Sequence, residues 1–166
     1  MSGDKEFKLA DAAQLFEEAN NFADAMIAQL QDLLGFHAAI SHVGATSIPG
    51  CLTKGDVDLV IRVEPKAFPA ARSAMDEHYV KNLGSPRDRN FASYTDDSGP
   101  FPLGVQLVVR GSEYDTFHRF ADNLRRSQPL LDSYNALKRS HEGADMEAYR
   151  KAKANFIERT LARAHG

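Results

Sequence analysis

HVGATSIPG at residues 42–50 and KGDVDLVI at residues 54–61 are the stretches that decide the fold of this chain. The first has the composition of a loop rich in glycine and hydroxyl residues, and the second is a strand bearing Asp56 and Asp58. Because side chains alternate along a strand, we expect both carboxylates on one face. Two like charges this close repel each other unless a cation or a proton lies between them. Loop N–H and hydroxyl groups suit phosphate, so the two stretches together predict a nucleotide site with a divalent cation.

The bulk composition is that of a globular domain. The 166 residues suffice for one sizeable core, and a charged fraction of 26% is ordinary for this class. A formal net charge of −3 gives no strong signal for nucleic acid and none for an anionic membrane. The chain has one cysteine, Cys51, so no internal disulfide forms, and a reducing compartment fits. With no signal peptide and no membrane-spanning run, the sequence predicts a cytoplasmic protein.

Hydrophobic periodicity predicts helices at both ends of the chain and strands in the middle. Before residue 111 we expect two helices, at residues 9–34 and 65–78. In the same part we expect five strands, at residues 37–43, 57–63, 80–83, 90–95 and 103–110. After residue 111 the pattern is helical again. Ser112 and Asp115 have the spacing of a capping box, Pro129 begins another helix, and a last one covers about 145–164.

This layout predicts an α+β protein with a mixed sheet flanked by helices and a helical C-terminal part. We divide it into a core with its N-terminal helix, residues 1–111, and a helical part packed on that core, residues 112–166. The two parts are expected to form a single globular unit.

The order of glycine loop, strand and carboxylate pair resembles the core of the nucleotidyltransferase superfamily, the polymerase-beta-like fold. Gly44 and Asp56 stand about a dozen residues apart, as the glycine turn and the carboxylate pair do in that superfamily. More narrowly, residues 42–50 with Lys54 and Asp58 resemble the hallmark of the GrpB family. The likeness continues to the last helix, at Phe120, Asp122, Leu124, Arg125, Tyr134, Leu137, Lys138, Tyr149, Lys153, Phe156 and Ile157.

The resemblance implies a metal-dependent nucleotidyltransferase that moves a nucleoside monophosphate from a nucleoside triphosphate to an unknown hydroxyl acceptor. Asp56 and Asp58 would be the catalytic carboxylates and would hold Mg²⁺ or Mn²⁺ against the phosphates. The nucleotide, or another phosphorylated small molecule, would be bound by Gly44, Ala45, Thr46, Ser47, Lys54, Arg87, Arg89 and Gln106.

Three positions depart from the patterns of these families. Ala45 replaces a usual serine, and Asp56 stands where GrpB proteins commonly have an aliphatic residue. Gln106 stands where GrpB proteins tend to have histidine and where active nucleotidyltransferases place a third carboxylate. Glutamine cannot act as a carboxylate base. The weak candidates for a third carboxylate are Glu64, Asp96, Asp97 and Glu113.

Two other functions stay open on these residues. A binding module that keeps the phosphate pocket without chemistry is favoured by Gln106, and a scaffold would use the fold only as a surface. At single positions, His42 is more typical of a hydrogen-bonded structural residue, and Arg87 and Arg89 of solvated surface charges. Thr46 and Ser47 fit ordinary turn chemistry as well as phosphate binding. The oligomeric state is not predicted.

Overall fold

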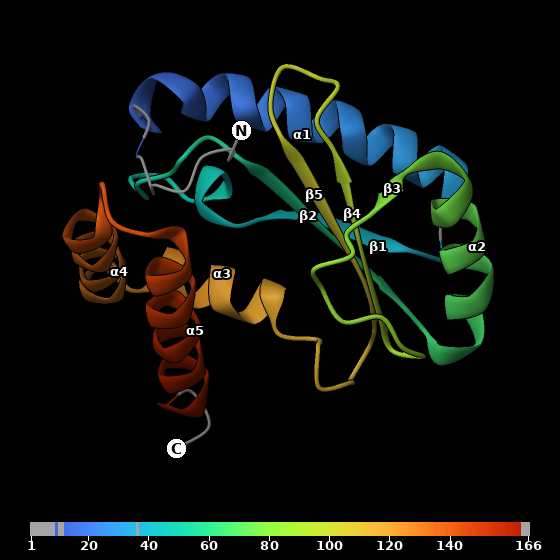
Figure 1. Ribbon diagram of the computed structural model, residues 1–166. Helices are drawn as coiled ribbons and strands as arrows, with labels where there is room; N and C mark the ends of the chain where they lie inside the picture. Colours follow the sequence, from blue (N-terminus) through green and yellow to red (C-terminus); the bar gives the residue numbers. More distant parts are fainter. Residues whose placement is uncertain (1–8, 10–11, 36, 164–166) are drawn as a thin grey trace.

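Five strands form one mixed sheet at the centre of the protein (Figure 1). The structure is a computed structural model and describes residue 9, residues 12–35 and residues 37–163. The strand order is β1-β2-β5-β4-β3. The bounds are β1 Ala39–Val43, β2 Val57–Val63, β3 Val80–Lys81, β4 Phe91–Asp96 and β5 Leu103–Val109. Only the β2–β5 pair is parallel, and the other three pairs are antiparallel, so the predicted mixed sheet is confirmed.

The two central strands, β2 and β5, are the most apolar segments of the chain. Their sequences, VDLVIRV and LGVQLVV, are rich in β-branched residues, which favour strands buried on both faces. The few polar side chains alternate with buried ones. In the parallel register, Asp58 lies opposite Gly104 and Val60 opposite Gln106. Asp58, Val60 and Arg62 therefore share one face of the sheet, which carries the site described below.

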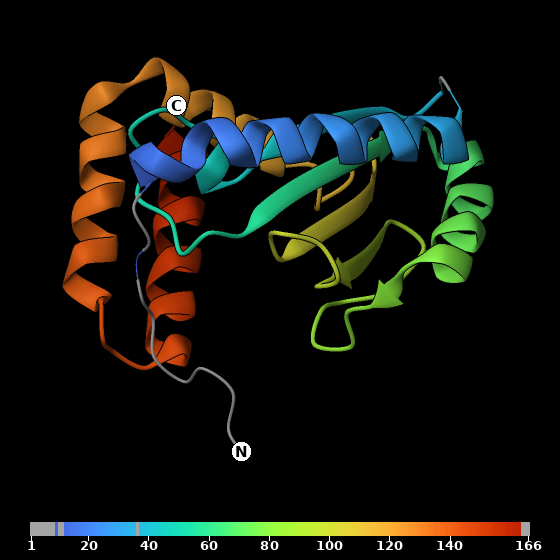
Figure 2. The same ribbon diagram turned by 90° about the horizontal axis from the view of Figure 1, so that it is seen from above.

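One face of the sheet is covered by α1 (Ala12–Leu34) and α2 (Phe68–His78) (Figures 1 and 2). Ala19, Ala23 and Leu30 of α1 are fully buried against Leu59 and Ile61 of β2 and their neighbours. The small alanines let this long helix lie close to the strands. A short 3-10 turn, η2 (Pro65–Ala67), leads from β2 into α2. The predicted helix start at residue 9 is too early: residue 9 is not helical, residues 10 and 11 lie outside the described residues, and α1 begins at Ala12.

The opposite face is covered by α3 (Phe117–Arg126), with α4 (Gln128–His141) and α5 (Met146–Arg163) side by side at one end of the sheet (Figures 1 and 2). Val60 and Val108 of the sheet pack with Ala121, Leu124 and Tyr134 of these helices in a second core. The change from strands to helices falls between residues 109 and 117, but a domain boundary at residue 111 stays a prediction. No helix in the described part of the chain has both the length and the apolar character needed to cross a bilayer.

The predicted capping box at Ser112 and Asp115 is wrong. The helix α3 begins at Phe117, and Thr116 is its N-cap residue. Asp115 accepts two hydrogen bonds from the Arg62 guanidinium, at 2.7 and 2.9 Å, and one from the Gly111 N–H at 2.9 Å. The bidentate, charge-assisted pair of Arg62 and Asp115 is stronger than a capping hydrogen bond, so Arg62 determines the conformation of the Asp115 side chain. The Ser112 hydroxyl oxygen is buried without a hydrogen-bond partner in the described structure.

Candidate functional site

The carboxylate of Asp58 lies between two glycines. Asp58 projects from β2, and a Cβ atom added at Gly104 on the neighbouring strand would stand 2.9 Å from Asp58 Oδ1. A Cβ atom at Gly44, where φ is +75°, would stand only 2.5 Å from Asp58 Oδ2. Any side chain at either glycine would collide with the carboxylate, and the positive φ of Gly44 disfavours other residues as well. Both glycines are therefore needed to hold Asp58 in this place.

The hydroxyls of Thr46 and Ser47 are used inside the loop that follows β1. This loop forms the 3-10 turn η1 (Ala45–Ser47), and both hydroxyl residues are buried. Thr46 Oγ1 donates to the backbone carbonyl of Asp56 at 3.0 Å, and Ser47 Oγ donates to that of Gly44 at 2.7 Å. Arg125 of α3 donates to Ser47 Oγ at 3.0 Å. These hydroxyls shape the loop, and neither residue lines the cavities described below.

His42 connects this loop to α1. Its Nε2 lies 2.9 Å from Thr46 Oγ1, and its Nδ1 lies 3.2 Å from Asn20 Oδ1. Asn20 also donates to the backbone carbonyl of Thr46 at 3.2 Å. Burial, assisted by the positive charge of Arg125, lowers the pKa of His42 to about 4. This shift favours the neutral imidazole at pH 7, and its two ring contacts give His42 the structural role expected of it.

A basic cavity of about 190 Å³ opens beside Asp58. It lies between the approach to β2 and the helices α4 and α5. Four cationic and two anionic side chains line it, with four other residues: Lys54, Lys138, Arg150, Lys153, Asp56 and Asp58, and Ala45, Thr53, Met146 and Tyr149. Asp56 forms an ion pair with Lys54 at 3.0 Å, and both side chains are partly exposed. The cavity thus collects an excess of positive charge in a protein whose net charge is negative.

Lys138 is the most buried cation of this cavity, with 3% of its surface exposed. Its ammonium group donates to the backbone carbonyl of Leu52, lies 3.5 Å from Cys51 Sγ and stands 4.3 Å from the ring centroid of Tyr134. Burial lowers the pKa of Lys138 to about 8. Its ammonium charge at pH 7 is thus held in place but poorly hydrated, which favours interaction with an anion.

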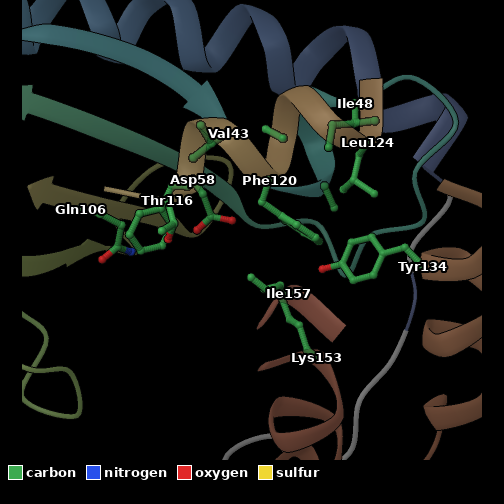
Figure 3. Close-up of a pocket in the computed structure, with 14 residues that line it drawn as sticks. Val43, Ile48, Asp58, Gln106, Thr116, Phe120, Leu124, Tyr134, Lys153 and Ile157 are labelled. Carbon is green, nitrogen blue, oxygen red and sulfur yellow. The ribbon is translucent and has the colours of Figure 1, made fainter. Parts of the chain in front are cut away.

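An apolar cavity of about 230 Å³ adjoins the basic one (Figure 3). It lies between the sheet, α3 and α5, and the two cavities share Ala45, Asp58 and Lys153. Aliphatic and aromatic side chains make up most of its wall, and its other lining residues are Val43, Gly44, Ile48, Gln106, Thr116, Phe117, Phe120, Ala121, Leu124, Tyr134 and Ile157. Asp58 therefore stands where a charged space and an apolar space meet.

The charge of Asp58 is poorly compensated by the protein. Burial raises the pKa of its carboxyl above the usual value; the nearby Asp56 raises it further, and Lys153, Lys54 and Lys138 only partly offset these effects. A half-buried carboxylate in this condition is stabilised by a proton or by a cation from outside the chain. Burial is the main cause of the raised pKa and Asp56 adds to it, and a cation held by the two aspartates stays a prediction.

These residues fit a magnesium or manganese ion only if a ligand completes its coordination. In the described part of the chain, no three His, Cys, Asp or Glu side chains are grouped to hold a metal. Asp56 and Asp58 line one cavity, however, and Mg²⁺ is commonly held by one or two carboxylates together with substrate phosphates. Gln106 lines the wall near Asp58 but adds no third charge.

Several expected site residues are not brought to Asp58. Arg87 pairs with Asp76 of α2 at 2.6 Å, Arg89 is exposed, and neither lines the two cavities. The four candidates for a third carboxylate are also absent from both walls: Glu64, Asp96, Asp97 and Glu113. Glu64 faces Arg110 at 3.7 Å, and Asp96 accepts hydrogen bonds from Ser98.

Sequence reasoning did not assign Gly104, Lys138, Arg150 or Lys153 to the site, although Lys138 and Lys153 were among the residues that carry the family resemblance. Gly104 interrupts a mostly apolar strand two residues before Gln106, and a glycine in such a place signals a close approach of other atoms. Arg150 lies three residues before Lys153 on α5, so the two side chains share one helix face. That spacing was a usable signal.

Comparison with known proteins assigns the family. The model of the GrpB protein family matches residues 11–163. The chain belongs to the GrpB family. Among curated relatives, this GrpB-family chain is 34% identical to a UPF0157 protein of Vibrio cholerae over 128 residues, which are 76% of this chain and 68% of that protein. It is 28% identical to a UPF0157 protein of Halalkalibacterium halodurans over 149 residues, covering 82% and 73% of the two chains.

Solved structures share the fold of this chain. The crystal structure of the conserved protein GrpB from Enterococcus faecalis matches this GrpB-family chain with a TM-score of 0.67 at 15% identity, covering 89% of this chain and 95% of that one. A c-di-GMP synthase, the STING-associated CdnE of Capnocytophaga granulosa, matches with a TM-score of 0.50 at 12% identity, covering 76% and 50%. At these identities the likeness shows the fold alone, which is nucleotidyltransferase-like.

Proposed function

We propose that this protein binds a nucleoside triphosphate with its phosphates in the basic cavity and transfers the nucleoside monophosphate to a hydroxyl acceptor. One observation carries the proposal: four cationic side chains and two carboxylates line a single cavity, and Asp58 stands at its junction with a second cavity. The nucleotidyltransferase-like fold supports it by analogy.

The cations have separate expected roles. Lys153 lines both cavities and, of the lysines around Asp58, has the largest effect on the pKa of its carboxyl, so it would contact the phosphates at the junction; the buried Lys138 would contact them from within the basic cavity. Lys54 and Arg150 also line the cavity and would receive the terminal phosphates. Charge-assisted hydrogen bonds of this kind are about twice as strong as neutral ones.

Asp56 and Asp58 are the residues that would hold Mg²⁺ or Mn²⁺. When bound, such an ion neutralises charge on the phosphoryl oxygens. The two glycines keep the Asp58 carboxylate fixed in orientation, and the loop bonds of Thr46 keep the backbone of Asp56 in place. During transfer the acceptor oxygen forms a bond to the α-phosphorus, the bond to the bridging oxygen breaks, pyrophosphate leaves, and the acceptor proton passes to solvent.

A binding experiment tests the first half of the proposal. Isothermal titration of ATP, GTP, CTP and UTP, each with and without MgCl₂ or MnCl₂, is expected to show saturable binding of at least one triphosphate. Arg150→Met should weaken that binding, whereas Arg89→Met, which removes an exposed charge outside both cavities, should not. Equal effects of the two variants, or a flat response to all four nucleotides, would contradict the proposal and favour a scaffold role.

A second candidate function is a nucleotide- or phosphate-binding module without chemistry. Gln106, which occupies the position of a third carboxylate, favours it, as does the lack of any acidic triad among the described residues. Pyrophosphate release distinguishes the two functions. Transfer predicts release that depends on Mg²⁺ or Mn²⁺ and disappears in Asp58→Asn, whereas the silent module predicts tight binding without release across a panel of alcohol acceptors.

A further inference from the structure

We propose that the apolar cavity is the acceptor site, and that the acceptor is a small alcohol with an apolar body. The proposal rests on the nucleotidyl transfer proposed above, and it assigns a ligand class to the cavity that, among the described residues, shares only Ala45, Asp58 and Lys153 with the basic cavity. A nucleic acid or a polar sugar would not fit the chemistry of this wall.

The wall of the apolar cavity carries more polar groups at one end than at the other, with Lys153 and the Tyr134 hydroxyl as further polar groups (Figure 3). Asp58, Gln106 and Thr116 gather at the end that the sheet forms. Ile48, Leu124 and the ring of Tyr134 lie at the far end, where α3 and α4 meet the η1 loop. A ligand with one hydroxyl at its end and a hydrocarbon remainder matches this distribution, because the hydroxyl finds partners and the remainder leaves water.

The size of the cavity limits the acceptor to a small molecule. A dry cavity of about 150 Å³ accommodates benzene, and pockets for drug-sized ligands measure about 300–1,000 Å³. At about 230 Å³, this cavity holds one ring with a short side chain or an aliphatic chain of similar volume. Folded macromolecules and oligonucleotides are excluded from it.

A nucleoside is a poorer occupant of the same cavity. Its base carries donors and acceptors along its edges, and burying them without partners costs free energy. At the far end the Tyr134 hydroxyl already shares a hydrogen bond with Tyr149. Lys153 is the only cationic side chain among the described lining residues, and it is shared with the basic cavity, so a separately phosphorylated acceptor is not favoured either.

The junction of the cavities brings the two ligands together. Ala45, Asp58 and Lys153 line both spaces, so a hydroxyl at the polar end of the apolar cavity would face an α-phosphate at the mouth of the basic one. Positioning of this kind is a large part of the catalysis of phosphoryl transfer.

The test uses 2-phenylethanol as probe and ethylbenzene as its matched hydrocarbon, followed by NMR chemical-shift titration of the full-length protein. We expect saturable binding of 2-phenylethanol, with ethylbenzene at least tenfold weaker because it leaves the polar end unpartnered. Ala121→Leu, which fills the cavity from α3, should weaken binding at least tenfold. Ala71→Leu, a buried alanine of α2 outside this cavity, should not.

The results separate failure of this inference from failure of the proposed function. Arg150→Met should lose triphosphate binding and keep 2-phenylethanol, and Ala121→Leu should do the reverse. Nuclear Overhauser contacts between the phenyl protons and the methyl groups of Ile157 or Leu124 in the unaltered protein give a readout that needs no variant. No saturation by 2-phenylethanol, indifference to Ala121→Leu, or displacement of the probe by free uridine or adenosine would overturn the inference.

Discussion

A double-mutant cycle between Gly104 and Asp58 tests the most specific contact of the site. Gly104 has an ordinary strand conformation, so alanine is compatible with its backbone, and a central strand gains about 0.5–1 kcal/mol when glycine becomes alanine. The added Cβ would stand 2.9 Å from Asp58 Oδ1, however, and the carboxylate has Gly44 close on its other side. Overpacking of this kind costs about 1–3 kcal/mol.

The net effect of Gly104→Ala is therefore expected to change sign with the residue at position 58. With Asp58 present, the free energy of unfolding should fall by about 1–2 kcal/mol, a loss of roughly 2–8 °C in Tm. In an Asp58→Ala background the obstacle is gone, and the same substitution should raise the free energy of unfolding by about 0.5–1 kcal/mol. The coupling energy is about 2 kcal/mol.

Urea denaturation of the four proteins at pH 7, followed by circular dichroism at 222 nm, measures each corner of the cycle. Asp58→Ala has its own effect on stability, but the cycle subtracts it. An equal effect of Gly104→Ala in the two backgrounds would refute the reasoning, because it would mean that the carboxylate does not stand against this glycine.

Other predictions concern pH and single contacts. The folded pKa of Asp58 is raised, so its ionisation does not affect stability below about pH 3.8, where the carboxyl is protonated in both states, and it destabilises the fold as pH rises through the folded pKa. Asp58→Asn should therefore be more stable than the unaltered protein at pH 7, with a smaller difference at pH 4, in parallel urea titrations. Lys138 has a folded pKa of about 8, against 10.5 for an unperturbed lysine, so the unfolded state binds more protons between these two pH values. Stability relative to Lys138→Met should therefore rise by on the order of 3 kcal/mol from pH 7 to 10.5. Ser112→Ala should change the unfolding free energy by less than about 0.5 kcal/mol, whereas a true cap would cost about 1 kcal/mol. Asp115→Ala should cost about 2–4 kcal/mol at neutral pH because it leaves Arg62 unpaired, and calorimetry of the two variants side by side measures both effects.

The central sheet and the loop were predictable because their signals are local. The β-branched runs of β2 and β5 can hardly form anything but buried strands, and the glycine loop with its two aspartates has a recognisable spacing. The conformation of Asp115 was not predictable in this way. Its partner Arg62 is 53 residues away in sequence, and a local capping pattern competes with a contact that only the folded chain creates.

The positions of charged side chains were also not predictable from local sequence signals. Arg87 and Lys138 are both single charges in polar segments, and the sequence alone favours a surface position for each. The fold pairs Arg87 with Asp76 at the opposite side of the sheet, and it buries Lys138 against the carbonyl of Leu52. Whether each charge is buried or exposed depends on the segments that pack against it in the fold, and hydrophobic periodicity carries no information about those contacts.

The basic cavity has one wall from the first half of the chain and one from the last two helices. Asp56 and Asp58 belong to the first, and Lys138, Arg150 and Lys153 belong to the second. An anion with its counter-ion would bridge the walls, so its binding free energy would add to the docking of α4 and α5 on the sheet. Amide hydrogen exchange in these two helices should then slow with ligand concentration, while exchange in α1 should not. If the proposed phosphate site is right, a molecule with α4 and α5 detached would keep its sheet but would not bind phosphate, because three of the four cations of the cavity would be gone.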